Sequence, residues 1–394
     1  MKQSPTKSYY LDHAASTPLE PAVRQAMRPY LDTEFANPSS LYGFARTSRN
    51  AVENARRTIA NTLGAKPTEI VFTSGGTEGD NLAVQGVLRA HPRAHWITSA
   101  IEHDAVLSCV DPMSAQGHNA TVVPVKPNGI VDVSELMANL TDETVLVSIM
   151  MANNEIGTIQ PVSDIAKKIQ VVRADRARRG VPLPLYLHTD AVQAAGYLDL
   201  HVARLGVDLL TIAGSKIYGP KGIGCLYVRH DTIMDALQYG GGQERGRRSG
   251  TENVAGIVGL ATALVRCAET REEESHRVGT LRDALARSLE EIIPELILNG
   301  DPKRRLPNNL NVTIPGVEGE ALVLYLDQAG IMASTGSACS TADLDPSHVL
   351  LAIGRTKSQA QSSLRLSLGR STDRQAIDHV LKKLPRITER LREL

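Results

Sequence analysis

Cysteine is scarce in this chain, and so are aromatic residues. The 394 residues include 4 cysteines (Cys109, Cys225, Cys267 and Cys339), one tryptophan, and 4% aromatic residues in all. None of the cysteines forms a Cys-x-x-Cys pair, so the sequence carries no zinc or iron–sulfur ligand pattern and no metal site is predicted. So few cysteines in a chain of this length argue against a disulfide framework and favour a reducing compartment.

An excess of either charge is also absent. Lysine and arginine number 43, aspartate and glutamate number 43, and the formal net charge is +0. This balance gives no electrostatic reason to expect a nucleic acid or an anionic membrane as a partner. No apolar run approaches the length of a membrane-spanning helix, and residues 1–8 lack the apolar core of a signal peptide. We therefore expect a soluble cytoplasmic protein with no direct nucleic-acid partner and no membrane partner.

Short apolar runs alternate with longer helical patterns over the first two thirds of the chain. Runs typical of strands lie at 69–72, 95–98, 120–125, 144–149, 185–188, 208–212 and 224–228. Helical patterns lie between them, for example at 45–63, 78–89 and 162–178. Strands that alternate with helices are typical of an α/β fold with a mostly parallel sheet. The closer spacing of the later strands indicates that the sheet is partly antiparallel, that is, mixed.

The pattern changes beyond about residue 253. A long helix is predicted to run to about residue 293, with strands at 309–314 and 363–368 and helices at 318–328 and 373–391. This region has the pattern of a smaller α+β domain attached to the long helix. We expect a large domain over 17–258 and a small domain made of 1–16 and 259–394.

Three polar groups follow predicted strands, where an open parallel sheet collects its ligands. Residues 73–78 open a helix whose free N–H groups suit a phosphate; the alternative is a plain turn with Thr77 as the helix cap. Asp190 is placed to pair with a protonated ring nitrogen or, alternatively, to cap a helix. Lys216 is placed to form an imine with an aldehyde or, alternatively, is a surface lysine in a turn.

Together these three groups suit pyridoxal 5'-phosphate (PLP), which has one phosphate, one ring nitrogen and one aldehyde. Cys339 is a further candidate, because it lies among the small and hydroxyl residues of 334–341 with no apolar stripe to pack against. We expect an exposed thiol that is available for chemistry. From its neighbours alone it could equally be a redox sensor or an incidental loop residue.

The chain resembles the cysteine desulfurases of the iron–sulfur assembly type, which are PLP-dependent fold type I enzymes of the class V aminotransferase family. The matching segments are 10–18, 37–40, 73–81, 102–103, 153–157, 190–193, 215–222, 240–251, 334–340 and 363–370. The resemblance implies conversion of L-cysteine to L-alanine, with sulfur held as an enzyme persulfide and passed to an acceptor protein, either a scaffold or a thiolation carrier. The alternatives are a selenocysteine lyase or another class V enzyme, and a PLP-free homologue that acts as an interaction protein.

The resemblance also implies roles at the cofactor, in the large PLP-binding domain. Lys216 would bind PLP covalently and, once freed, would shuttle the α-proton of the substrate. Asp190 would pair with the pyridinium nitrogen, and Gln193 would donate a hydrogen bond to the phenolic oxygen. Thr77 and the backbone of Gly76 would hold the phosphate.

Further roles concern the substrate. His103 would stack on the ring and assist proton transfer, whereas its alternative is to cap a helix. Arg365 would pair with the substrate carboxylate. Asn154 would contact cofactor or substrate, and Asn37 would also bind substrate. Cys339 would be the nucleophile that accepts sulfur.

One implied role involves a second subunit, and two positions near Lys216 depart from the family pattern. Thr251 would reach the phosphate of the neighbouring subunit, which implies a homodimer with shared sites. Lys216 usually follows a histidine but here follows Ser215, and Ala213 stands where a serine often contacts the phosphate. We expect Ser215 to supply the missing hydroxyl to the cofactor.

Overall fold

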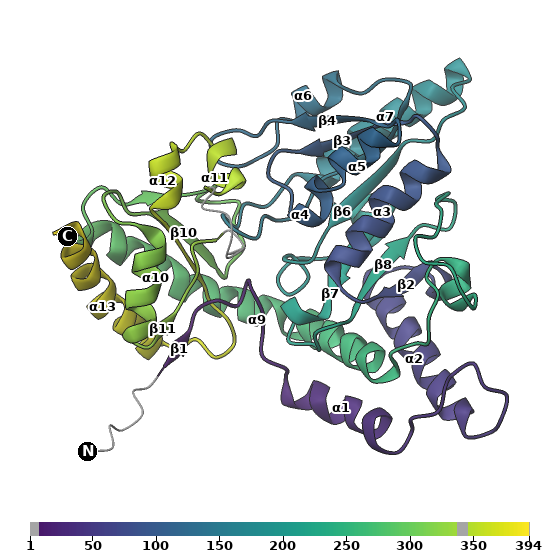
Figure 1. Ribbon diagram of the computed structural model, residues 1–394, viewed down its shortest axis with the longest axis horizontal. Coiled ribbons are helices and arrows are strands. Elements are labelled where there is room, and N and C mark those ends of the chain that lie inside the picture. The colour runs from purple at the N-terminus through teal and green to yellow at the C-terminus, as the bar shows by residue number, and fades with distance from the viewer. Residues whose placement is uncertain (1–7, 337–345, 394) are drawn as a thin grey trace.

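The computed structural model describes residues 8–336 and 346–393, and it shows two parts joined by one long helix (Figure 1). The larger part contains a seven-stranded sheet of order β2-β8-β7-β6-β5-β3-β4. β8 runs antiparallel to both of its neighbours, and the other pairs are parallel. The predicted mostly parallel, mixed sheet is therefore confirmed. Its strands are β2 (Ile70–Thr73), β3 (His95–Ser99), β4 (Asn119–Val123), β5 (Thr144–Ser148), β6 (Tyr186–Asp190), β7 (Leu209–Ala213) and β8 (Gly224–Val228).

Helices cover both faces of this sheet. Neighbouring residues of a strand enter different cores: Ile97 and Val147 pack in one, Trp96 and Leu146 in the other. Burial on both faces explains why these strands appear in the sequence as continuous apolar runs. The first core includes α1 (Pro21–Asp32), α2 (Ala45–Leu63), α6 (Val133–Ala138), α7 (Val162–Arg179) and α8 (Val202–Leu205). The second includes α3 (Gly76–Ala90), α4 (Asp104–Leu107) and α5 (Val110–Ala115).

The smaller part has its own sheets and its own core. A three-stranded antiparallel sheet has the order β12-β10-β9, and a two-stranded parallel sheet joins β1 to β11. Its apolar core includes Leu11 from the N-terminal segment and Leu366 from β12. The strands are β1 (Tyr9–Tyr10), β9 (Ile297–Leu298), β10 (Asn309–Thr313), β11 (Ile331–Met332) and β12 (Ser363–Ser367). The helices are α10 (Gly319–Gln328), α11 (His348–Ala352), α12 (Lys357–Gln361) and α13 (Arg374–Arg392).

The long helix α9 (Val254–Ile292) belongs to both parts. The side chain of Asn253 caps the N-terminus of this helix, because its Oδ1 accepts a hydrogen bond from the N–H of Gly256 at 3.0 Å. Residues 257–267 pack in the core of the larger part, and residues 278–289 pack in the core of the smaller part. The domain bounds 17–258, 1–16 and 259–394 stay a prediction. Among the described residues, no helix has both the length and the apolar character needed to cross a membrane.

Candidate active site

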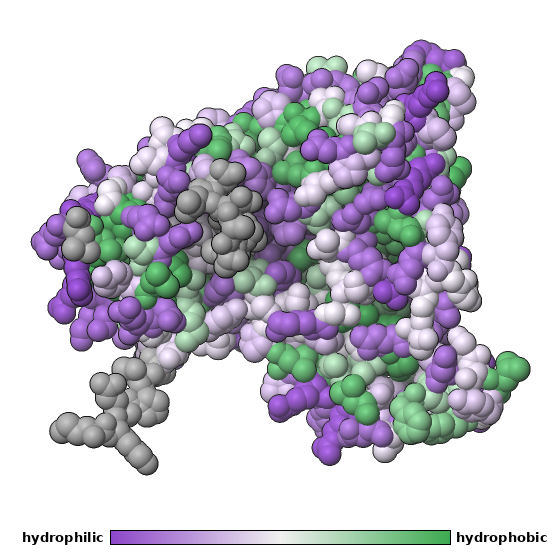
Figure 2. All heavy atoms as spheres, in the orientation of Figure 1, coloured by the Kyte–Doolittle hydropathy of each residue, from purple (hydrophilic) through white to green (hydrophobic). Residues whose placement is uncertain are grey.

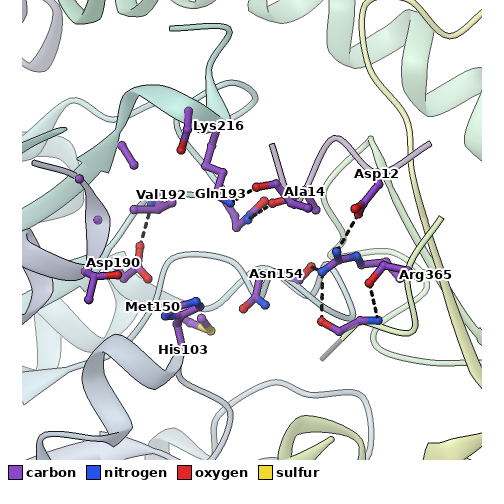
Figure 3. A pocket seen from close by; sticks show the side chains of 18 of the residues that line it. Asp12, Ala14, His103, Met150, Asn154, Asp190, Val192, Gln193, Lys216 and Arg365 are labelled. Carbon is purple, nitrogen blue, oxygen red and sulfur yellow. Dashed lines mark hydrogen bonds and ion pairs between the residues drawn. The ribbon is translucent and has the colours of Figure 1, made fainter. Parts of the chain in front are cut away.

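A pocket of about 1250 Å³ lies between the two parts, at the carboxyl ends of strands of the large sheet. Figure 3 shows Asp190, Lys216 and His103 reaching it from the larger part and Arg365 from the smaller part. Asn37 and Thr251 are exposed and do not line it. Cys339 lies outside the described residues. The predicted residues that line the pocket are Gly76, Thr77, His103, Asn154, Asp190, Gln193, Ser215, Lys216 and Arg365.

One end of the pocket is formed by the start of α3. The helix begins at Gly76, so Thr77 is its second residue and the alternative role as helix cap is wrong. The first N–H groups of a helix lack carbonyl partners and carry the positive end of its dipole, so this end suits a phosphate. A Cβ atom on Gly76 would lie 2.8 Å from Cγ2 of Val192, so only glycine lets the helix start pack this closely against the segment after β6.

Asp190 lies at the end of β6 and is 7% exposed. Its Oδ1 accepts a hydrogen bond from the N–H of Val192 at 2.8 Å, and the residues that follow form turns and no helix, so its alternative as a helix cap is wrong. Burial raises the pKa of this carboxyl, and the backbone hydrogen bond and the nearby His103 and Lys216 lower it. A cation placed beside Asp190 would offset the burial, and a protonated pyridine nitrogen is such a cation.

Lys216 ends η2 (Gly214–Lys216), the short 3-10 turn that follows β7. It lines the pocket half-buried, and its Nζ donates a hydrogen bond to the carbonyl of Ala15, so it is no surface lysine. Burial first, and the charge of Arg365 second, lower the pKa of its ammonium group. A lowered pKa favours the neutral amine, which is the form that reacts with an aldehyde. The pocket therefore offers a suitable partner to each reactive part of PLP.

Two further predicted residues are held by backbone groups. His103 caps α4, because its Nδ1 accepts a hydrogen bond from the N–H of Ala105 at 3.0 Å. The capping alternative is therefore confirmed, and His103 also lines the pocket. With Nδ1 accepting, a neutral His103 carries its proton on Nε2. Gln193 donates a hydrogen bond from Nε2 to the carbonyl of Ala14 at 3.0 Å, which connects the N-terminal segment to the segment after β6.

Arg365 comes from β12 and is 5% exposed. Its Nη1 donates to the carbonyls of Asn154 at 3.1 Å and Gly336 at 3.2 Å, and its Nη2 pairs with Oδ1 of Asp12 at 2.9 Å. Its Nε is buried and has no hydrogen-bond partner among the described residues. A guanidinium in a pocket wall with an unpaired N–H suits a carboxylate ligand.

Sequence reasoning gave no role to several charged residues at the site. Asp12 lies in a family-like segment, which was the available signal, but its pairing with Arg365 joins residues 353 positions apart. Asp80 lines the pocket near Asp190, and burial and the charge of Asp190 raise its pKa well above the usual range. Glu102 is fully buried and accepts hydrogen bonds from Oγ of Ser99 at 2.5 Å and from the N–H of Met150 at 2.8 Å.

The three cysteines that the structure describes are all buried. Burial raises the pKa of the Cys225 thiol to about 12 and that of Cys267 to about 11, and it also raises the pKa of Cys109. A thiolate is the reactive form of cysteine, so none of these three suits a nucleophile. Within residues 8–336 and 346–393, no cluster of His, Cys, Asp and Glu side chains is arranged to hold a metal ion.

Comparison with known proteins agrees with the fold and the pocket. The family model described as aminotransferase class-V matches residues 9–380. The protein "Cysteine desulfurase IscS" of Clostridium botulinum is 45% identical over 392 residues, which cover 98% of this chain and 96% of that protein. A solved "NifS-like protein" superposes with a TM-score of 0.89 at 34% identity, covering 98% of this chain and 100% of the other.

A second solved structure, a NifS-like protein from Rickettsia africae, superposes with a TM-score of 0.85 at 31% identity and covers 97% of this chain and 99% of the other. The similarity thus extends over both parts of the molecule and includes every segment that lines the pocket. The chain therefore belongs to the class-V aminotransferase family, alongside relatives that are cysteine desulfurases.

Proposed function

We propose that the protein is a PLP-dependent cysteine desulfurase that converts L-cysteine to L-alanine and takes up the sulfur as a persulfide on Cys339. One observation carries the proposal: a single pocket holds a helix start for the phosphate, Asp190 for the ring nitrogen, Lys216 for the aldehyde, and Arg365 for the substrate carboxylate. The names of relatives with 45% identity support the same reaction.

The chain's own residues divide the chemistry between them. When bound, PLP supplies an electron sink for the amino-acid substrate. Arg365 fixes the substrate carboxylate, and the amine of Lys216, whose pKa is lowered, takes and returns the α-proton. The Cys339 thiolate attacks the substrate sulfur, so an S–S bond forms and the substrate C–S bond breaks. The electron pair of the broken C–S bond moves to the substrate carbon that carried the sulfur, and this carbon is then protonated. The products are L-alanine and the Cys339 persulfide.

The persulfide passes its sulfur to an acceptor protein, a scaffold for iron–sulfur clusters or a thiolation carrier. Relatives named IscS support an acceptor of this kind. A cytoplasmic location is supported by the small number of cysteines, three of which are buried and free of disulfides.

The protein also acts as a homodimer in this proposal, with Asn37 and Thr251 reaching the site of the second copy. Both residues are exposed and outside the pocket of their own chain. The segment 240–251 is tied to α2 by Arg56, whose Nη1 and Nη2 pair with Glu244 at 2.8 and 2.7 Å.

The loop that leads into α2 exposes apolar side chains, which supports a covered surface there. Figure 2 shows green, apolar residues at the corner of the molecule that α1 and this loop occupy. The exposed residues are Leu31, Phe35, Leu41, Tyr42 and Phe44.

The test is a persulfide assay on the purified, PLP-loaded protein with L-cysteine, read by the mass of the peptide that contains Cys339. We expect that peptide to gain one sulfur atom and L-alanine to form in equal amount. Cys339→Ala should lose both products, whereas Cys109→Ala, which removes a buried thiol, should keep them.

Other outcomes identify the alternatives. Activity that survives in Cys339→Ala indicates a selenocysteine lyase or another class V enzyme. A protein that shows no visible absorption band, with or without added PLP, indicates a homologue that binds partners only. A band that disappears in Lys216→Ala excludes that alternative.

A further inference from the structure

We propose that Asp12 is a positioning residue for the substrate carboxylate: it holds the Arg365 guanidinium so that two of its N–H groups stay free for a bidentate pair. The inference rests on the proposed function, since it takes an amino acid as the ligand of Arg365. Figure 3 shows Asp12 and Arg365 side by side at one end of the pocket, which both of them line.

The protein uses only some of the hydrogen-bond donors of Arg365. A guanidinium has five N–H groups. Nη1 donates to the carbonyls of Asn154 and Gly336, and Nη2 donates once to Asp12, which leaves two of the five without a partner among the described residues. One of these is the N–H of Nε, which is buried and unpaired. One carboxylate can accept from the Nε–H of a guanidinium and the Nη2–H beside it, because these two groups are parallel.

The position of Asp12 fits an orienting role better than a competing one. A carboxylate that competed for the site would accept both N–H groups of one guanidinium edge, whereas Asp12 accepts one bond through Oδ1. Three acceptors from three separate segments, Asp12, Asn154 and Gly336, therefore fix the plane of the guanidinium and leave two of its N–H groups without a partner among the described residues.

The backbone around Asp12 is itself held in place. The Tyr10 hydroxyl donates to the carbonyl of Asp12 at 2.9 Å, and the N–H of Leu11 donates to the carbonyl of Met332 at 2.9 Å. Asp12 also forms a parallel bridge with Ser367, two residues beyond Arg365 on β12. Because both partners sit on backbone joined by hydrogen bonds, the Asp12 carboxylate is held beside the Arg365 guanidinium.

The experiment measures binding of L-alanine and of ethylamine, which lacks the carboxylate, to the PLP-loaded protein through the change in PLP absorbance. Asp12→Ala should weaken L-alanine binding about tenfold or more and leave ethylamine binding within about twofold. Asp12→Asn keeps an oxygen that accepts from Nη2, so its L-alanine affinity should stay within about threefold of wild type. Asp12→Glu keeps the charge but displaces the oxygen, so it should weaken L-alanine binding about fivefold or more.

Several results would overturn the inference. Wild-type affinity for L-alanine in both Asp12→Ala and Asp12→Glu contradicts it, and so does a loss in Asp12→Asn as large as in Asp12→Ala, because charge would then be the cause. If Asp12→Ala does not fold, the Asn and Glu variants decide the question. Wild-type protein that binds PLP but no L-alanine also overturns it.

The same measurements separate this inference from the proposed function. The expected pattern of L-alanine binding together with no persulfide on Cys339 would leave the inference standing and contradict the proposed function. Normal persulfide formation with L-alanine binding that is indifferent to Asp12 would do the reverse.

Discussion

At the scale of single residues, burial shifts the pKa values of several groups at and near the pocket. Burial raises the pKa values of Asp80, Glu102 and Asp190, and it lowers that of Lys216. Each of these shifts favours the uncharged form of its group, because burial removes the water that would stabilise the charge.

Glu102, the buried residue before His103, gives the stability of the protein a measurable pH dependence. Its pKa is raised by burial from 4.5 to about 8, so between these values the folded protein holds a proton that the unfolded chain has lost. The folded state is therefore destabilised as pH rises through this window. Glu102→Gln cannot titrate and keeps hydrogen-bond partners for Ser99 and Met150. The Tm of this variant minus that of wild type should therefore be larger at pH 9 than at pH 5, by about 2 °C or more. A difference in Tm that does not vary with pH contradicts this expectation.

Ser215 lies directly before Lys216, at a position where the family resemblance leads us to expect histidine. Ser215 lines the pocket. Its backbone carbonyl accepts two hydrogen bonds from Thr17, one from the N–H at 2.9 Å and one from the Thr17 hydroxyl at 3.0 Å. A Ser215→Ala substitution would keep both of these backbone contacts. Loss of one hydroxyl hydrogen bond should raise the dissociation constant of PLP about threefold to tenfold, measured by titration of the apo protein. Adding Ala213→Ser to that variant should restore much of the affinity, because it places a hydroxyl at a second position that lines the pocket. Unchanged PLP affinity in Ser215→Ala contradicts the role.

The sequence predicted the site well where chemistry follows a strand end and poorly where distant segments meet. Asp190 and Lys216 each end or follow a strand of the sheet, so their convergence could be inferred from the fold class. The pairing of Asp12 with Arg365 and of Gln193 with Ala14 depends on how the N-terminal segment crosses between the two parts, which no local pattern encodes.

At the scale of elements, the position of α3 on the sheet depends on Gly79. A Cβ atom there would lie 2.7 Å from Cγ2 of Thr211 on β7. Thr211 cannot easily rotate away, because its Oγ1 lies 3.1 Å from Nε2 of His188 in a hydrogen bond. The helix start that would bind the phosphate is therefore set by a glycine three residues further along the same helix.

Gly79→Ala should push α3 from the sheet and destabilise the protein by about 1–3 kcal/mol in denaturant unfolding, with weaker PLP binding. Gly279→Ala in α9 is the matched control. Its new Cβ would lie 3.6 Å from the nearest side-chain atom, an ordinary contact, so helix propensity should leave stability unchanged or raise it by up to about 1 kcal/mol. Equal effects of the two substitutions would show that packing against Thr211 does not position the helix.

Long elements were predictable from periodicity, and short ones were not. The helical pattern at 45–63 and the strand pattern at 224–228 match α2 and β8 residue for residue. The two-residue strands β1, β9 and β11 exist because they pair with partners remote in sequence, so no pattern of their own marks them. Helix α1 lacks a side-chain cap and contains Pro29, which weakens its sequence signal.

At the scale of the whole molecule, the proposed homodimer can be tested at the exposed apolar loop before α2. Leu41 is 97% exposed in the single chain. Leu41→Glu should raise the dissociation constant of the dimer at least about tenfold, measured by sedimentation velocity, since burying a charge in an apolar interface is costly. Val171→Glu, at an exposed apolar position on α7, is the control and should leave the dimer intact. A dimer that persists in Leu41→Glu would show that this loop lies outside the interface.

Helix α9 has a consequence for how the protein unfolds. Its 39 residues form one continuous rod about 58 Å long, and its two halves are built into two different cores. Melting of either half of the helix would expose apolar surface in the core that this half fills, and it would shorten an element that the other part also uses. Lys216 lies in the larger part and Arg365 on β12 of the smaller part, so the helix that both parts share also connects the two sides of the pocket.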